Sequence, residues 1–357
     1  MIKYLLFLLL CIAGLVIFSS PGLPKTEYFH KNIRIETRVD SLKFSDGPYI
    51  LIDNDSIIEL NIINGNLNTK TFPSSTKIMK FEVEPSLYHN VERIAALSDL
   101  HGQYDLTIEI LTNNGVIDTD LKWNFGTGHL VIVGDIFDRG EKVTELLWFV
   151  YNLEKQALAS GGKVHFLLGN HEYMVMQNDL RYINKKYRYT EHVTKTPYNI
   201  LYSDKSLLGR WLRSKNTIEV INDNIFVHGG ISQEFIENGF DLKGVNDSLR
   251  QSIHKDESTT QWDSIYGKYH DFYSPVWYRG YFTDSLKKGQ VNKLLKKLDV
   301  KHIIVGHTSQ IKIESLFDNR IFGVDSSIKN GLDGEILFIE NGTYYRGKKD
   351  GEKIKFD

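Results

Sequence analysis

The sequence predicts an α/β fold, and three features of the chain support this prediction. From Val91 onward, short apolar runs alternate with polar loops and amphipathic segments, which is typical of strands that alternate with helices. Polar residues beside glycine follow five of the apolar runs, as expected where the ends of strands build a site. Residues 25–88 instead carry short β-rich runs between turn residues, which indicates a small β-rich extension ahead of the α/β domain.

The composition limits the chemistry that is available. The 357 residues allow a main domain of roughly 250 residues and an accessory segment. A formal net charge of −2 gives no overall basic field, so we expect no nucleic-acid partner. The single cysteine, Cys11, lies in an apolar leader, which excludes a disulfide, a cysteine zinc site and a thiol nucleophile further along the chain. Any catalysis must therefore use His, Asp, Asn and Arg.

Residues 1–24 have the layout of an export signal. Lys3 precedes the apolar run Tyr4–Phe18, as in a charged region followed by a hydrophobic region. Ser19 follows the run without an A-x-A pattern, so a retained signal anchor and a cleaved signal peptide are both open; lipidation at Cys11 is the third alternative. We expect the rest of the chain to be membrane-anchored on the extracytoplasmic side, or secreted or periplasmic after cleavage.

The β-rich segment, residues 25–88, carries no cluster of catalytic residue types. Tyr49–Ile52 and Ile57–Ile62 have the composition of strands, and Asn64-Gly65 is typical of a type I′ hairpin turn. We expect a spacer that packs on the main domain, with a separate binding site as the alternative.

The main domain is predicted over residues 89–347. Its apolar runs predict strands and two intervening helices, the strands at Arg93–Leu97, His129–Val133, Lys163–Leu168, Asn224–Val227 and Lys301–Val305, and the helices near Tyr104–Leu111 and Glu141–Leu158. Asn341-Gly342 predicts a closing hairpin within Glu335–Tyr345.

Residues 173–215 are helical in pattern, aromatic and basic, and predict a cap over the site. Within this segment, the run Lys185–Tyr189 either attracts phosphate or anionic lipid or forms a solvated helix face.

Five short motifs carry the chemistry, each at the C-terminal end of a predicted strand. They are Ser98–Gly102, Gly134–Gly140, Gly169–Glu172, His228–Gly230 and Gly306–Thr308. Each motif offers a metal-ligand side chain beside glycine, which allows the backbone to bend sharply. Ordinary turn residues would not explain why every such turn presents Asp, His or Asn. Imidazole and carboxylate together favour a pair of Zn, Fe or Mn ions over Ca, with Asp135 of the second motif as the best bridging ligand.

The motifs resemble those of the calcineurin-like metallophosphoesterases, and specifically the phosphoprotein phosphatase family, over about Val91–Ser326. The most specific parts are Asp99-x-His101-Gly102, Asp135-x-x-Asp138-Arg139-Gly140 and Gly169-Asn170-His171-Glu172. The resemblance implies a βαβαβ sandwich of two mixed sheets flanked by helices.

The resemblance also implies the residues of the site. Two divalent metal ions (Mn, Fe or Zn) would be held by Asp99, His101, Asp135, Asn170, His228 and His307. His171 and Asp138 would form a proton-donating pair, and Arg139 would bind the phosphate. Ser98, Phe137 and Gly306-His307-Thr308 depart from the family pattern, but none of these departures removes a ligand.

Two further segments, Ser274–Tyr281 and Asn178–Tyr182, resemble the Shewanella-like protein phosphatase branch of the family. This resemblance nominates Arg279 as a second phosphate-binding arginine. The alternative is a packing role for this segment through Trp277 and Tyr278.

The function expected from these motifs is hydrolysis of phosphomonoesters by a binuclear metal centre and metal-bound hydroxide, with a phosphorylated protein or a small phosphoester as substrate. A symmetrical dinucleoside tetraphosphatase, or another nucleotide phosphohydrolase, is the alternative within enzymes. An inactive, membrane-tethered phospho-binding module is the alternative outside them, and we expect such a module to lack a metal ligand.

Overall fold

The computed structural model describes residues 43–357 apart from 54–55, 74–79, 238, 255–265 and 284–285. The predicted leader therefore lies outside the described residues. Within those residues, no helix has the length and apolar character needed to cross a membrane.

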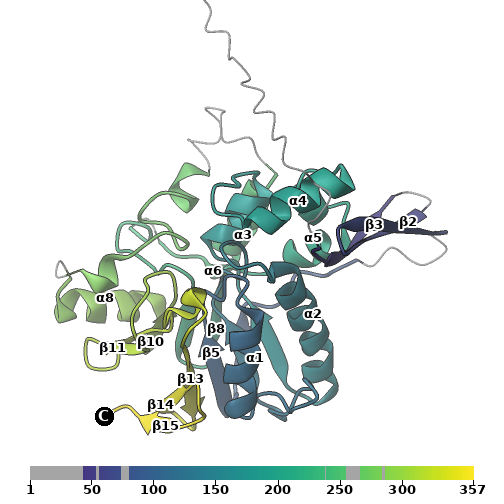
Figure 1. Ribbon diagram of the computed structural model, residues 1–357. Coiled ribbons are helices and arrows are strands. Elements are labelled where there is room, and N and C mark those ends of the chain that lie inside the picture. Colours follow the sequence, from purple (N-terminus) through teal and green to yellow (C-terminus); the bar gives the residue numbers. More distant parts are fainter. Residues whose placement is uncertain (1–42, 54–55, 74–79, 238, 255–265, 284–285) are drawn as a thin grey trace, which may run out of the picture. The chain divides into compact units, whose positions relative to one another are not determined.

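Two six-stranded mixed sheets build the main domain (Figure 1). The first sheet has the order β15-β14-β13-β5-β6-β7. Its strands are β5 (Arg93–Leu97), β6 (His129–Ile132), β7 (Lys163–Phe166), β13 (Glu335–Glu340), β14 (Thr343–Lys348) and β15 (Lys353–Lys355). Ala96 pairs with Val131 and Val131 pairs with His165, in parallel register. The three strands that precede the first three motifs therefore run in the same direction.

The second sheet has the order β11-β12-β10-β9-β8-β4. Its strands are β4 (Leu87–Tyr88), β8 (Ile218–Ile221), β9 (Asn224–Val227), β10 (His302–Val305), β11 (Glu314–Leu316) and β12 (Ile321–Gly323). Val305 pairs in parallel with Val227 on one side and with Gly323 on the other. β4 is the edge strand of this sheet, although the predicted boundary assigns residues 25–88 to the accessory segment.

The core fills both faces of the first sheet. Ile94 and Ala96 of β5 belong to a buried cluster with Phe226 and Ile304 of the second sheet. Leu97, one position further along, belongs to the cluster on the opposite face. Strands that are buried on both faces read as continuous apolar runs, and this explains why the sequence pattern identified them.

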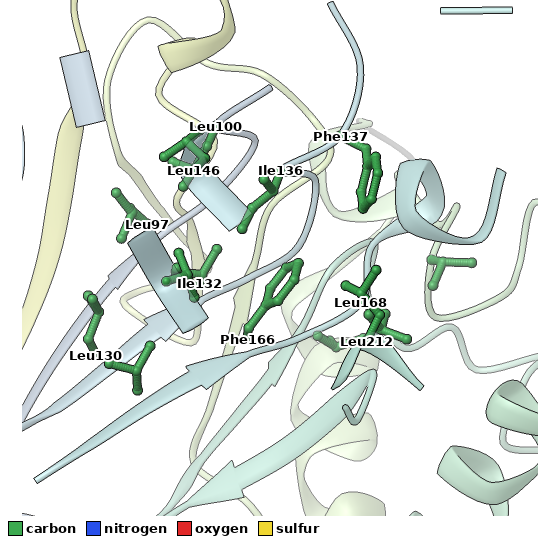
Figure 2. Packing of buried hydrophobic residues seen from close by; sticks show 14 of the residues in the cluster. Leu97, Leu100, Leu130, Ile132, Ile136, Phe137, Leu146, Phe166, Leu168 and Leu212 are labelled. Carbon is green, nitrogen blue, oxygen red and sulfur yellow. The ribbon is translucent and has the colours of Figure 1, made fainter. Parts of the chain in front are cut away.

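The outer face of this sheet packs against helices. Figure 2 shows Leu97, Leu130, Ile132 and Phe166 of β5–β7 together with Leu146, which lies beside Leu100, and all of these residues belong to one buried cluster. Full burial of a leucine side chain stabilises a fold by roughly 1.5–3 kcal/mol. This face therefore fixes the strands whose ends carry the motifs.

The helices follow the predicted pattern. They are α1 (Tyr104–Asn113), α2 (Val143–Ala159), α3 (Asn170–Met176), α4 (Lys185–Thr194), α5 (Leu207–Leu212), α6 (Leu242–Ser252) and α8 (Lys288–Leu298). The first two start within two residues of their predicted starts, and residues 173–215 contain no strand. The α/β prediction is confirmed.

The described part of the accessory segment forms a three-stranded antiparallel sheet of β1 (Asp46–Ile52), β2 (Ser56–Ile63) and β3 (Asn66–Pro73). Asn64 and Gly65 have φ angles of 50° and 80°, as a type I′ turn requires, so the predicted hairpin is confirmed. The sheet packs on the main domain: Trp148 Nε1 of α2 donates to the carbonyl oxygen of Pro48 over 2.8 Å. Asn341 and Gly342 likewise connect β13 to β14 with φ angles of 48° and 76°, which confirms the closing hairpin.

The basic run Lys185–Tyr189 is only partly solvated, because Lys185 and Arg188 are exposed but the two residues between them are not. Lys186 and Tyr187 are buried, and Lys186 Nζ lies 3.3 Å from Asp46 Oδ1 and 3.1 Å from Glu145 Oε1. Neither a solvated face nor an anion-binding patch describes these two side chains. The reason is that α4 packs against the accessory sheet, which supplies Asp46.

Candidate metal centre

The five predicted motifs begin within three residues of the ends of β5, β6, β7, β9 and β10. The structure brings all six predicted metal-binding residues to these strand ends, and each of them is buried: Asp99, His101, Asp135, Asn170, His228 and His307. Four of these residues follow strands of the first sheet and two follow strands of the second, so the site lies across the sandwich.

Asp135 lies at the centre of the site. Its Oδ2 atom is 3.6 Å from His101 Nε2, 3.8 Å from His171 Nε2 and 3.2 Å from His228 Nε2. Two groups of three residues share this carboxylate, His101–Asp135–His171 and Asp135–His228–His307, and the ligand atoms in each group lie within 4.8 Å of one another. One carboxylate between two clusters of nitrogen atoms is the arrangement of a bridging ligand.

Main-chain carbonyls orient two of the histidines. His101 Nδ1 lies 2.6 Å from the carbonyl oxygen of Phe137, and His228 Nδ1 lies 2.7 Å from that of Val133. With Nδ1–H donated to a carbonyl, Nε2 presents its lone pair to the site. Burial lowers the pKa of His101 to about 3, so the neutral, ligating form predominates near pH 7.

Asp99 is held from two sides. Its Oδ2 atom accepts hydrogen bonds from Ser98 Oγ over 2.6 Å and from the main-chain N–H of His307 over 2.8 Å. Its Oδ1 atom lies 3.8 Å from His101 Nε2. Burial, with the charge of Asp325 adding to it, raises the pKa of Asp99 to about 8, which is the cost of leaving this carboxylate without a cation beside it.

The residues present fit a metal pair. His307 Nε2 is buried and has no hydrogen-bond partner among the described residues. It belongs to the second group of three, beside Asp135 and His228. Asn170 Oδ1 adds an oxygen donor 2.9 Å from His228 Nε2. A buried imidazole nitrogen without a partner is costly unless it binds something, and this donor set suits Zn, Fe or Mn.

The backbone of the site is strained at the functional residues themselves. Six non-glycine residues have φ between 43° and 71°, namely Asp99, His101, Asp135, Asp138, Arg139 and His307. Each costs of order 1 kcal/mol or more, and such residues cluster at functional sites. The prediction that glycine supplies the sharp bends holds for Gly102, Gly134 and Gly230, whose φ angles are 68°, 85° and 142°, but it did not extend to these six residues or to Gly169. Gly169 has extended backbone instead and is needed for space, because a Cβ atom there would meet Asp135 Oδ1.

His171 and Asp138 form a buried pair. His171 Nδ1 is hydrogen-bonded to Asp138 Oδ2, and this leaves Nε2 directed at Asp135. Burial lowers the pKa of His171, but the carboxylates of Asp135 and Asp138 outweigh burial and raise the pKa above its ordinary value. The ring therefore holds a proton more readily than a free histidine does.

Two arginines border the site. Arg139 is exposed, and its main-chain N–H donates to the carbonyl oxygen of Tyr182 over 3.0 Å. Arg279 Nη1 donates to the carbonyl oxygen of His307 and, over 3.3 Å, to Thr308 Oγ1. The packing alternative for this segment also has support, because Tyr278 is buried.

Only part of the predicted cap reaches the site. The loop between α3 and α4 contacts it through Tyr182, whose ring centroid lies 5.4 Å from that of His171. α4 and α5 instead pack against the β1–β3 sheet.

Glu172 is the residue that the sequence analysis missed. Its carboxylate accepts four main-chain N–H groups, those of Asp135 at 2.9 Å, Ile136 at 2.8 Å, Phe137 at 3.3 Å and Gly169 at 2.7 Å. It thereby joins the second motif to the third. A glutamate at the third position of a helix that follows a strand was the available signal, because this position caps the first turn.

Comparison with known proteins identifies the class. Residues 92–310, more than half of the chain, match the family of calcineurin-like phosphoesterases. The chain belongs to this family, whose members use divalent metals, and it is a hydrolase that acts on phosphoric esters. The motif-based prediction of the family is confirmed.

Individual relatives indicate the branch of the family to which the chain is similar. A cold-active protein-tyrosine phosphatase of a psychrophilic Shewanella species is 38% identical in sequence, with a TM-score of 0.84, over 88% of this chain and 100% of that one. Shewanella-like protein phosphatase 2 of Arabidopsis thaliana is 27% identical over 320 residues, covering 74% of this chain and 79% of its own length. Shewanella-like protein phosphatase 1 of Plasmodium berghei is 27% identical over 291 residues, covering 75% of each. The predicted similarity to the Shewanella-like branch is confirmed.

Proposed function

We propose that this protein is a metal-dependent protein phosphatase with a preference for phosphotyrosine. One observation carries the proposal: two groups of ligand atoms share Asp135 beside an exposed arginine, which is the arrangement that a phosphoester needs. The 38% identity with a protein-tyrosine phosphatase over nearly the whole chain supports the substrate class.

Asp99, His101 and Asp135 would hold the first metal ion, while Asp135, Asn170, His228 and His307 would hold the second. The mixed nitrogen and oxygen donors favour manganese, iron or zinc, and we propose manganese for assay. Two such ions, when bound, supply Lewis acidity and make water a nucleophile near neutral pH.

The arginines of the chain bind the substrate's phosphate in this proposal. Arg139 is exposed beside the site, and its planar fork matches the geometry of phosphate oxygens. Arg279 lies on the other side, beside His307, and would contact a second oxygen. Both interactions strengthen as negative charge develops in the transition state.

His171 donates the proton to the leaving oxygen. Asp138 fixes the ring at Nδ1, so the proton on Nε2 is the one that faces the site. The raised pKa of His171, caused by Asp135 and Asp138, favours the protonated form of this donor.

The competing functions have less support. A phospho-binding module without activity should lack a ligand, and all six predicted ligands are present and adjacent. Three of the similar proteins carry phosphatase names, namely the two Shewanella-like protein phosphatases and the cold-active protein-tyrosine phosphatase. We also propose an extracytoplasmic, membrane-tethered location, which rests on the export pattern of residues 1–24 alone.

The test uses the full chain, purified in mild detergent. Bound metal is counted by mass spectrometry, and turnover with manganese is measured on phosphotyrosyl, phosphoseryl and phosphothreonyl versions of one peptide and on a dinucleoside tetraphosphate. We expect two metal ions per chain and the highest kcat/KM on the phosphotyrosyl peptide. A fully metallated protein that cleaves only the dinucleoside tetraphosphate would overturn the proposal.

A further inference from the structure

We propose that Tyr182 is a specificity-determining residue of the active site, whose ring forms an aromatic wall that favours aryl over alkyl phosphoesters. The inference rests on the proposed phosphatase function and deepens it, because it assigns the preference for phosphotyrosine to a side chain.

The position of the Tyr182 ring carries the argument. Its centroid lies 5.4 Å from that of His171, and the two rings are inclined at 52°. The Arg139 guanidinium carbon lies 5.7 Å from the same centroid. The ring thus lies near both the group proposed to protonate the leaving oxygen and the group proposed to bind phosphate, so a leaving group that engages both would lie close to it.

The ring is also available for contact. Tyr182 is 45% exposed, which is unusual for a tyrosine beside a buried site, and its neighbours His171 and Asp138 are buried. The side chain therefore presents apolar surface at the entrance rather than filling the core. The other exposed groups that adjoin it, Arg139 and Arg181, are cations that stack on its ring.

The loop that carries Tyr182 is fixed to the phosphate-binding motif. The Tyr182 carbonyl oxygen accepts the main-chain N–H of Arg139 over 3.0 Å, and Asn184 Nδ2 donates to the Arg139 carbonyl oxygen over 2.8 Å. Arg188 Nη2 of α4 donates to the Leu180 carbonyl oxygen over 3.0 Å. A wall that is anchored on both sides costs little conformational entropy when substrate binds.

The chemistry of the two substrate classes differs at this wall. In phosphotyrosine the ring is attached directly to the ester oxygen, so a substrate ring could pair with that of Tyr182. In phosphoserine a single methylene group occupies that place and offers no ring. An aromatic pair of this kind corresponds to roughly a two- to tenfold preference.

The experiment compares the full-length protein with Tyr182→Leu and Tyr182→Phe. The quantity measured is the ratio of kcat/KM for a phosphotyrosyl peptide to that for the phosphoseryl peptide of the same sequence. We expect Tyr182→Leu to lower this ratio by roughly two- to tenfold, mainly through KM, and Tyr182→Phe to retain it. Leu158→Ala, at the exposed C-terminal end of α2, is the matched surface control and should leave the ratio unchanged.

The sign of the change separates this role from an indirect one. If Tyr182 only supported His171, its loss would weaken proton donation, and the alkyl ester, with the poorer leaving group, would suffer more. The ratio would then rise, and a rise or no change would overturn the inference while leaving the phosphatase function intact. A wild-type protein that binds metal but cleaves neither peptide would overturn the function and the inference together.

Discussion

Replacing Glu172 by glutamine should uncouple the two central motifs. Each carboxylate oxygen of Glu172 accepts two main-chain N–H groups: Oε1 accepts those of Ile136 and Phe137, and Oε2 accepts those of Asp135 and Gly169. Glutamine keeps the length and shape of the side chain, but it offers only one acceptor oxygen. In either orientation of the amide, its oxygen can accept from one pair of N–H groups while its NH₂ group faces the other pair. That second pair then has no acceptor.

The magnitude follows from the two bonds that are lost. A hydrogen bond to a charged acceptor contributes about 1.5–3 kcal/mol, so Glu172→Gln should lower the free energy of unfolding by roughly 3–6 kcal/mol. The second effect is on metal binding. Glu172 holds the main-chain N–H of Asp135, and loss of a group that orients a ligand typically weakens metal affinity by about 10- to 100-fold.

The assay is urea unfolding of the metal-free protein, followed by a manganese titration under native conditions. Glu109→Gln is the control, since Glu109 is an exposed glutamate on α1. The metal-free measurement separates the effect on the fold from the effect on the site. A Glu172→Gln protein that unfolds at the same urea concentration as the Glu109→Gln protein, with the same manganese affinity, would refute the reasoning.

Three further predictions follow from the same geometry. Asp135→Asn removes the one carboxylate that both groups share, so the protein should stay folded by circular dichroism but lose both metals by mass spectrometry. Its aryl phosphatase activity should fall by roughly a thousandfold or more. An unchanged metal content would contradict the bridging role. His171→Asn should retain both metals, and its kcat should fall by roughly 10²–10⁴-fold on an alkyl ester but by less on an aryl ester. Equal falls on the two esters would argue against proton donation by His171. Burial lowers the pKa of His270 to about 4, so the unfolded chain binds a proton more readily. The stability that neutral His270 contributes should be complete above about pH 6.5 and fall by roughly 3 kcal/mol as the pH drops to 4. Urea unfolding measured at each pH should show a flatter dependence for His270→Gln.

The features that depend on local sequence, such as the positions of buried strands, were predicted correctly. The apolar runs at Arg93–Leu97 and Asn224–Val227 are strands with the predicted bounds, because strands buried on both faces leave an uninterrupted signal. The rule that strand ends build sites predicted that the five motifs lie together, and the resemblance to the metallophosphoesterases supplied the individual ligands.

Long-range contacts account for what the sequence did not reveal. β4 joins the second sheet only because Leu87 and Tyr88 pair with β8, more than a hundred residues away. Lys186 is buried because α4 meets Asp46 of the accessory sheet. Asp135 and His307 have left-handed backbone, which Asp and His adopt more often than most residues but still uncommonly, so the residue types alone did not predict it.

Hydrogen bonds between the ligand loops connect the two sheets at the metal centre. The loops that carry the ligands are bonded to one another across the sandwich: His307 N–H donates to Asp99 Oδ2 over 2.8 Å, and the Asp99 N–H donates to the Gly134 carbonyl oxygen over 3.1 Å. Asp99 follows the first sheet and His307 the second. Any change in the spacing of the sheets therefore moves ligands of one cluster relative to the other. A cavity between the sheets, such as Phe226→Leu would leave, must for this reason weaken metal binding along with stability, although Phe226 belongs to the buried core rather than to the site.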